Sequence, residues 1–519
     1  MQGKKDYSEK LFTNFQLSDR VPKDNFYRRL KDVLDLNYLY KETEHLYGKE
    51  GQKSIDVTVF FKICLVGFFE NIISDRQLMN FCSMRLDVMY FLGYDIDEPL
   101  PWYSTISRTH KLIPDDVFVM TFEKILTMCV EKGMVGGKNQ AIDSAPIKAN
   151  ASMDTLELKV PEDTLEDHLR KVRYMSTPDR KPKINKAPKE QQEISASDRE
   201  LKEIKSRNKK WSKDQDQRPG VRSAHSKYTS NKTHYSPTDP DARISVKPGK
   251  ARKLNYHAQM AVDTDHHVIT HIAADFADKK DNQSLQAIVA ELKPRLQKNG
   301  LIWRNVLADT GYSSGEEYAF LEQQCLQSYI PPHGTFKGGP EGFCFDQENN
   351  QYQCPQGKWL TFRGTKINDK GKKVNSYSTS RADCKGCPMA EKCKGKSFEK
   401  RVTVTYYREE YERAIERLQS KQGRYLMNKR KSTVEPVFGT LKEFRGLRKL
   451  NTIGISQANK KMLMSATAYN LKKYLKFTAK QAMSQAKALR LYFNEKTEGV
   501  LAQIITLYQL IFRSSRFQL

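Results

Sequence analysis

The sequence lacks any apolar run long enough to cross a membrane. Its most apolar late stretch, residues 500–512, has about 13 residues and contains Gln503 and Gln509, whereas a membrane-spanning helix needs roughly 20. The first ten residues are polar and basic with no apolar segment behind them, so they do not look like a secretory signal. We therefore expect a soluble protein that stays in the cytoplasm and has no membrane partner.

Cysteine is also scarce, with nine residues in a chain of 519. A small, odd number in so long a chain argues against a disulfide framework, so burial or metal binding must explain these thiols. The length itself exceeds what a single hydrophobic core supports, and it predicts two to four modules.

Acidic residues are too few to balance the basic ones. The chain has 62 Asp and Glu against 88 Lys and Arg, a formal net charge of +26. Such an excess indicates a polyanionic partner, and nucleic acid is the leading candidate. From charge alone, a ribosome-associated protein or a merely well-solvated basic protein is the alternative.

The N-terminal quarter has a helical pattern. Between residues 21 and 135, apolar residues recur at three- and four-residue spacing, which is typical of amphipathic helices. We expect residues 1–135 to form a helical DNA-binding domain. Helices opening at Ser74 and Ser104 would permit a helix-turn-helix-like reader with Arg108 exposed. A packing bundle with an exposed basic face explains the same pattern equally well.

A different pattern begins near residue 140. Strand-like segments at 140–147, 254–262 and 268–274 precede a helix at 282–298, a strand at 305–308, a helix at 314–324 and a short strand at 328–330. Acidic residues close the first and fourth strands. This β-β-β-α-β-α-β order predicts an α/β ribonuclease H-like catalytic domain, in which those two strands lie side by side.

Two insertions divide the predicted catalytic domain. The first part of that domain is residues 136–332, and it contains a flexible basic insertion at about 165–253 whose composition cannot bury a core. A Cys-rich insertion at 333–404 follows. The catalytic domain then resumes with helices at 405–475, and residues 476–519 form a helical tail. The chain is thus predicted to be multidomain.

Three acidic residues carry the predicted chemistry: Asp143, Asp309 and Glu435. Phosphodiester cleavage and strand transfer use two divalent cations about 3.5 to 4 Å apart. Carboxylate oxygens are the ligands that Mg²⁺ or Mn²⁺ prefers. Taken singly, each acid is more often a solvated strand end or a helix cap. Together, at the ends of two strands and on a later helix, they predict a site for two metal ions.

The segments around these acids resemble those of the DDE transposases of bacterial insertion sequences. They read Ile-Asp-Ser-Ala-Pro-Ile-Lys-Ala-Asn from residue 142, Ala-Asp-Thr-Gly-Tyr-Ser from 308, and Val-Glu-Pro-Val-Phe-Gly-Thr-Leu-Lys from 434. The similarity covers about residues 17–475. It is to the insertion-sequence-four and -five group, and nearest to the eleven-eighty-two family.

The resemblance implies a function and its partners. Such a protein binds double-stranded DNA at terminal inverted repeats and at a target, cuts and joins it with divalent metal ions, and works as a homo-oligomer, a dimer, on DNA in the nucleoid. A Tyr, Arg, Glu, Lys pattern around the last acid maps here onto Tyr425, Arg430 or Lys431, Glu435 and Lys442. The expected DNA contacts are Tyr425, Arg430, Lys431, Lys442, Arg445 and Arg108.

The Cys-rich insertion suggests a second metal. Cys384 and Cys387 form a Cys-x-x-Cys pair, with Cys393 after it and Cys354 before it, a spacing suited to structural Zn²⁺. Cys344 is a substitute for Cys354. A redox pair is the alternative, but the surroundings are rich in Gly and Lys and do not read as a strand leading into a helix.

Two other functions compete with that of an active transposase. One is a catalytically silent DNA-binding relative, which the intact acids argue against. The other is a hydrolytic ribonuclease H-like nuclease, which leaves the helical N-terminal region and the basic insertion without a purpose.

Overall fold

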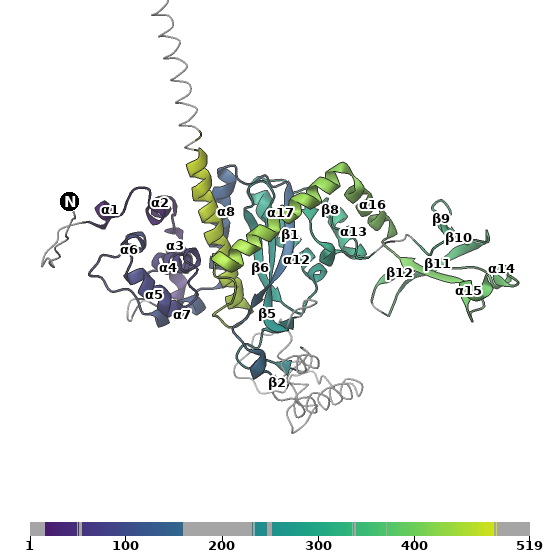
Figure 1. Cartoon of the computed structure of the whole chain (residues 1–519), viewed down its shortest axis with the longest axis horizontal. Coiled ribbons are helices and arrows are strands. Elements are labelled where there is room, and N and C mark those ends of the chain that lie inside the picture. Colours follow the sequence, from purple (N-terminus) through teal and green to yellow (C-terminus); the bar gives the residue numbers. More distant parts are fainter. Residues whose placement is uncertain are drawn as a thin grey trace, which may run out of the picture.

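The computed structural model describes residues 16–48, 50, 54–158, 231, 234–245, 252–334, 336, 339–369, 371–481 and 484. Most of the predicted basic insertion at 165–253 and most of the predicted tail at 476–519 lie outside the described residues. Figure 1 shows N-terminal helices at one end, a sheet with its helices in the middle, and a smaller sheet at the other end.

The N-terminal region is helical, as predicted. Its elements are α1 (Leu17–Arg20), α2 (Phe26–Val33), α3 (Tyr38–Thr43), η1 (Glu44–Leu46), α4 (Val57–Phe69), α5 (Asp75–Ser83), α6 (Leu86–Leu92), α7 (Tyr103–Leu112) and α8 (Asp115–Glu131). Polar side chains begin three of them, since Asn25, Asp56 and Ser74 accept backbone N–H groups of the first turn. Helix α4 is buried along almost its whole length, so it is the centre of this region.

The two helices predicted for a DNA reader are present but are not consecutive. Helix α5 begins after Ser74, whose Oγ accepts the Gln77 N–H at 3.5 Å. Helix α7 begins at Tyr103, one residue before the predicted Ser104, and α6 lies between the two in sequence. Helices α5 and α7 pack on each other, and Arg108 is exposed on α7.

A mixed sheet forms the middle of the molecule. Its strands are β1 (Asn139–Lys148), β4 (Arg243–Ser245), β5 (Lys253–Asp263), β6 (Ile269–Phe276), β7 (Asn305–Leu307) and β8 (Gln327–Tyr329), in the order β4-β5-β1-β7-β8 with β6 also paired to β5. Helices η3 (Asp281–Ser284), α12 (Leu285–Lys298), η4 (Thr310–Tyr312) and α13 (Gly315–Gln323) connect the later strands. The predicted order of elements around this sheet is confirmed, and the predicted first and fourth strands, β1 and β7, lie side by side, where they pair in parallel.

The end of the predicted basic insertion is ordered, contrary to expectation. Strand β2 (Glu157–Leu158) pairs with β3 (His234–Tyr235), and β4 adds to the edge of β5. Asp239 is fully buried and accepts the Tyr256 hydroxyl at 2.7 Å. This segment needs no core of its own, because β5 of the central sheet supplies hydrogen-bond partners for its backbone and the Tyr256 hydroxyl supplies one for Asp239. Composition could not reveal this.

The Cys-rich insertion contains a five-stranded antiparallel sheet that was not predicted. Its strands are β9 (Cys344–Asp346), β10 (Gln351–Gln353), β11 (Trp359–Ile367), β12 (Lys373–Ser378) and β13 (Arg401–Thr405), in the order β13-β12-β11-β10-β9. The short helices α14 (Arg381–Cys384) and α15 (Ala390–Lys394) connect β12 to β13. Its small core is Tyr352, Leu360, Tyr377 and Val402. Strand β11 is mostly exposed, and the buried positions of β12 include the polar Ser376 and Ser378, so both lack the apolar alternation that marks a strand in a sequence.

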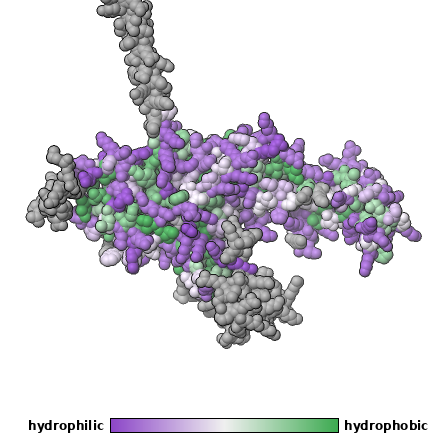
Figure 2. All heavy atoms as spheres, in the orientation of Figure 1, coloured by the Kyte–Doolittle hydropathy of each residue, from purple (hydrophilic) through white to green (hydrophobic). Residues whose placement is uncertain are grey.

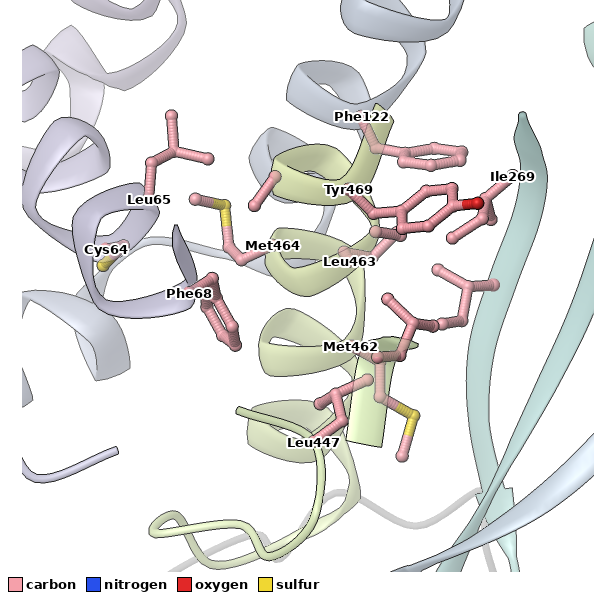
Figure 3. Close-up of a cluster of buried hydrophobic side chains, with 14 of the residues drawn as sticks. Cys64, Leu65, Phe68, Phe122, Ile269, Leu447, Met462, Leu463, Met464 and Tyr469 are labelled. Carbon is pink, nitrogen blue, oxygen red and sulfur yellow. The ribbon is translucent and has the colours of Figure 1, made fainter. Parts of the chain in front are cut away.

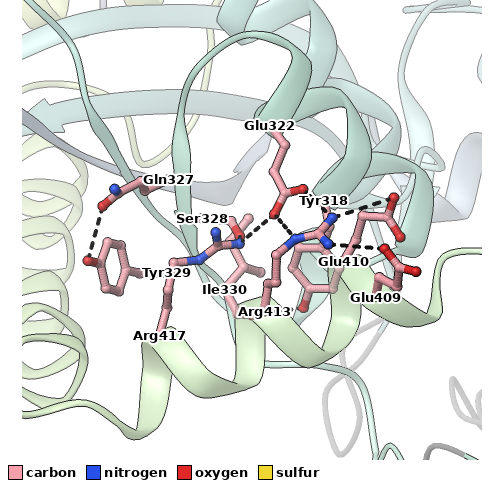
Figure 4. A network of polar contacts seen from close by, with 10 residues as sticks. All are labelled: Tyr318, Glu322, Gln327, Ser328, Tyr329, Ile330, Glu409, Glu410, Arg413 and Arg417. Atoms are coloured by element: carbon pink, nitrogen blue, oxygen red, sulfur yellow. Dashed lines mark hydrogen bonds and ion pairs between the residues drawn. The ribbon is translucent and has the colours of Figure 1, made fainter. Parts of the chain in front are cut away.

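Two helices return the chain from this small sheet to the central one. Helix α16 (Arg408–Gln419) packs on α13 through Glu322, which pairs with Arg413 at 2.7 Å and with Arg417 at 3.1 Å (Figure 4). Helix α17 (Lys421–Phe444) follows directly, with the Ser420 hydroxyl capping its first turn, and it crosses the sheet over β1 (Figure 1). The α16 contacts therefore set where α17 begins.

One core joins the N-terminal helices to the sheet. The helical stretch at residues 455–481 lies between α4 and β6, and it buries Met464 toward Phe68 on one side while Tyr469 lies beside Ile269 (Figure 3). Buried residues of α4, α8, β1, β5 and α17 belong to the same cluster. Hydrophilic side chains dominate the face seen in Figure 2. The region predicted as a separate domain at 1–135 thus shares its core with the predicted catalytic domain.

Candidate active site

The central sheet brings Asp143 and Asp309 to the same level on neighbouring strands. The parallel pairing of β1 with β7 ends at Ala141 and Leu307, and each aspartate lies two residues beyond that pair. Because side chains alternate along a strand, both aspartates lie on the same face of the sheet as Ala141 and Leu307. Those two residues belong to the core cluster that also contains buried residues of α17. The sequence predicted that an acid closes each of these strands; this holds for Asp309, which follows the end of β7, but β1 continues past Asp143 to Lys148.

The two carboxylates differ in environment. Asp143 is in the middle of the long strand β1 with 19% of its side chain exposed, and its Oδ1 accepts the Ser144 N–H at 2.8 Å. Asp309 is 44% exposed and begins η4, where its Oδ1 accepts the Gly311 N–H at 2.9 Å. Burial raises the pKa of Asp143 to about 6; Arg430 opposes this shift, and the nearby Asp309 adds to it.

Arg430 of α17 lies against both aspartates. Its Nη2 is 3.3 Å from Asp143 Oδ2 and 4.0 Å from Asp309 Oδ2, and only 7% of its side chain is exposed. Lys431, the alternative for this position, is exposed. Of these two neighbours, the arginine is therefore the one that faces the aspartates. The burial of this face of α17 on the sheet decides the orientation.

Glu435 does not join the two aspartates here. It is exposed on α17, five residues after Arg430, which is about 140° around an ideal helix. Within the described ranges, no group of three or more His, Cys, Asp or Glu side chains is close enough to hold a metal ion. The next residue, Pro436, is inside the helix and has no N–H for the Ser432 carbonyl, which weakens the helix at this point.

Asp281 is a further carboxylate at this edge, and the sequence reasoning missed it. The Ser144 hydroxyl donates to Asp281 Oδ1 at 2.5 Å. A Cβ added to Gly311 would lie 2.8 Å from Asp281 Oδ2 and 3.0 Å from Asp309 Oδ1, so a side chain there would have to displace the Asp281 carboxylate. An acid before a predicted helix is normally read as a cap, which hid its position beside β1 and β7.

The other expected DNA contacts have different positions. Tyr425 is 60% exposed on α17, Lys431 and Arg108 are exposed, and Lys442 is half-buried. Arg445 was expected on a DNA-facing surface, and that prediction is wrong. It is buried, and its Nη1 donates to the Phe69 carbonyl at 2.8 Å, so it satisfies the C-terminal end of α4.

The cysteines of the small sheet gather at one end of it. Cys354 is in the turn after β10, where its Sγ accepts the Lys358 N–H at 3.3 Å, and Cys384 Sγ is 3.0 Å from Thr379 Oγ1. Burial raises the pKa of Cys393; Lys400 opposes the shift, and the thiols of Cys354, Cys384 and Cys387 add to it. The four thiols are therefore near one another, although no three of them are close enough in the described part of the chain to hold a metal ion. Cys344, the substitute, is exposed opposite Gln353 in the β9–β10 pairing.

None of the helices among the described residues is long and apolar enough to span a bilayer.

Two segments match models of known protein families. Residues 15–112, from α1 to α7, match the Transposase domain (DUF772). Residues 353–475, which include the four thiols, Arg430 and Glu435, match the Transposase DDE domain. Neither match assigns the chain to a particular group of insertion sequences. No curated protein gives a match to this chain.

Proposed function

This chain, with a transposase domain at each end of its described core, belongs to the DDE transposases, and we propose that it binds the ends of an insertion sequence and cuts and joins DNA where Asp143 and Asp309 meet. One observation carries the proposal: the two aspartates lie at the same level on neighbouring parallel strands and share one cation. The strand order, with β1 beside β7, supports a ribonuclease H-like catalytic domain. Placement in the eleven-eighty-two family stays a prediction from sequence.

The aspartates fit a site for divalent metal ions. They offer hard oxygen ligands, and the Arg430 guanidinium between them shows that the pair attracts a positive group. In this proposal Asp143, Asp309 and Glu435 hold two Mg²⁺ or Mn²⁺ ions. When bound, such ions activate the attacking oxygen and stabilise the leaving oxygen.

Glu435 has to approach the aspartates for this set to be complete. It belongs to the helix whose Arg430 already contacts both of them, so the proposal requires α17 to turn or bend until Glu435 faces the aspartates. Pro436 locates that change, because a helix bends most easily where a proline removes a backbone hydrogen bond. The binding of DNA and metal would supply the driving force.

The exposed side of α17 is the surface that we propose for a DNA end. Tyr425 offers an aromatic face, and Lys431 and Lys442 offer positive charge for phosphates. Arg108 of α7 is a further exposed cation in the N-terminal region. The net charge of +26 supports steep salt dependence of binding. We propose a dimer on DNA, as the family resemblance implies.

The test measures cleavage and joining separately. Asp143→Asn, Asp309→Asn and Glu435→Gln should each lower cleavage of DNA bearing the inverted repeats that flank the gene by on the order of 1,000-fold, with end binding retained. Glu443→Gln, an exposed acid on the same helix, is the matched control and should cleave normally. Full cleavage by any of the three variants would remove that residue from the site.

A second substrate separates the competing functions. A pre-cleaved end with a free 3′-hydroxyl should be joined to a target plasmid by the wild-type chain. Cleavage without joining would favour a hydrolytic nuclease, and end binding without either reaction would favour a silent DNA-binding relative.

A further inference from the structure

The Arg430 side chain is enclosed where the two aspartates meet. Its side chain is 7% exposed, and Nη2 is 3.3 Å from Asp143 and 4.0 Å from Asp309. Its Nε is buried with no hydrogen-bond acceptor in the described part of the chain. A buried N–H without an acceptor costs free energy, so the contact with the carboxylates must compensate for it. The guanidinium is therefore held by its ion pairs with the two aspartates, while its Nε–H lacks a hydrogen-bond acceptor among the described residues.

The aspartates need a positive group in this position. Two carboxylates on neighbouring strands repel each other, and burial of Asp143 strengthens that repulsion. Among the ion pairs of the described residues, those of Arg430 are the ones that reach either aspartate. Arginine does not lose its proton in a protein, so this positive charge is permanent.

We propose that Arg430 is the resident counter-cation of Asp143 and Asp309, and that a divalent metal ion binds there by displacing it. This inference rests on the proposed function. The arginine keeps the two carboxylates together before metal arrives, and it lowers their apparent affinity for metal because the competent arrangement is only part of the population. Once displaced, the guanidinium is free to contact a DNA phosphate, the role that the sequence predicted for it.

Metal binding by the full-length protein without DNA tests the exchange. Titration with Mn²⁺, followed calorimetrically, should show that Arg430→Gln binds the ion about tenfold or more tightly than the wild type. Arg430→Lys should lie between them, since an ammonium is a single point charge that cannot span both carboxylates. Arg424→Gln makes the same substitution at an exposed arginine earlier on the same helix and should leave the affinity unchanged. Asp143→Asn should abolish binding at this site.

Two outcomes would overturn the inference in distinguishable ways. Equal or weaker Mn²⁺ binding by Arg430→Gln, with binding still lost in Asp143→Asn, would refute the exchange and leave the proposed active site in place. Mn²⁺ binding that does not depend on Asp143 would refute both.

A second measurement needs no substitution at Arg430. Labelling of arginines with a dicarbonyl reagent, mapped by mass spectrometry, should find Arg430 protected in the metal-free wild type and labelled about tenfold faster with Mn²⁺, as displacement requires. Exposed Arg108 should be labelled equally in both conditions. Unchanged protection of Arg430 at saturating Mn²⁺ would show that the ion does not displace it.

Discussion

At the residue scale, the site depends on how acidic groups are tolerated in a folded interior. Asp143 is largely buried, with a pKa of about 6, and Arg430 keeps it compatible with its surroundings. Asp281 is stabilised differently, by the hydroxyl of Ser144 on the other side of β1. The carboxylates at this edge are thus each tied to the sheet by a specific partner before any metal is present.

Glu317 of α13 gives a prediction about pH. Burial raises its pKa to about 7; Gln286 donates to Oε1 at 3.0 Å, but Oε2 has no partner among the described residues. Because the folded pKa is raised, the folded state holds the proton more tightly. The free energy of unfolding should therefore fall, by about 1 to 3 kcal/mol, as the pH rises through the window from 4.5 to 7.

Substitution isolates this contribution from those of other acids. Glu317→Gln keeps the size of the side chain and its hydrogen-bonding capacity but cannot ionise. Urea unfolding at pH 5 and pH 8 should show a smaller loss of stability for the variant than for the wild type. An equal loss in both proteins would mean that Glu317 does not titrate in this range.

At the element scale, the position of α17 is set by what surrounds it. Helix α16 is fixed to α13 by the pairs of Glu322 with Arg413 and Arg417, and Arg417 also donates to Ser328 at 3.1 Å (Figure 4). At its other end, α17 is followed by Arg445, which is bonded to the carbonyls that end α4. The contacts at the two ends of α17 together determine which face of the helix is turned toward the aspartates.

Loss of Glu322 should loosen the start of α17. Glu322→Ala leaves two guanidinium groups without their carboxylate, and because the pairs are only partly buried we expect a loss of about 1 to 2 kcal/mol in unfolding free energy. Glu409→Gln, which removes only an exposed partner of Arg413, should cost under about 0.5 kcal/mol. Thermal and urea unfolding compare the two, and equal effects would contradict a special role for Glu322.

The cysteine end of the small sheet predicts a bound metal. We propose that Cys354, Cys384, Cys387 and Cys393 hold one structural Zn²⁺, because a module with so small a core gains folding free energy from metal binding. Purified protein should contain about one zinc per chain by elemental analysis, and Cys384→Ser with Cys387→Ser should release it. Zinc-free protein in which residues 340–400 resist proteolysis would refute a structural zinc.

At the scale of the whole molecule, the continuous core limits how the chain can be divided. Helices of the N-terminal region, one face of the central sheet and the helical stretch at 455–481 bury one another (Figure 3). The small sheet is different, since its core is separate and it projects from the rest of the molecule (Figure 1).

Truncation should reveal this difference. A chain without residues 1–134 would expose the apolar surface of the 455–481 helix and β6, so we expect aggregation or loss of cooperative unfolding. Replacing residues 340–404 by a short Gly-Ser linker should leave cooperative unfolding nearly intact. The measurement is solubility together with calorimetric unfolding. A soluble, cooperatively folded 135–481 fragment would show that the N-terminal helices are an independent domain.

The sequence by itself determined the order of the main strands and helices of the central sheet and which of them carry Asp143 and Asp309. Both depend on local patterns, because apolar periodicity defines an element and the residues of an acidic motif take their places within it. Asp309 follows the end of a buried strand, whereas Asp143 lies within β1. The match in order and spacing around the acids likewise predicted the transposase family, which the family models confirm. The cysteine spacing indicated a metal module, although not the sheet beneath it.

Only the tertiary structure decided which side chains of a helix are buried against the sheet and which are exposed to solvent. Arg430 and Lys431 are neighbours about 100° apart on a helix, so the crossing of α17 over the sheet, and not the sequence, selects which one is buried. The same packing buries Arg445, leaves Glu435 outside and brings Asp281 beside Ser144. Each outcome depends on contacts between segments far apart in the chain, and local periodicity carries no information about such contacts.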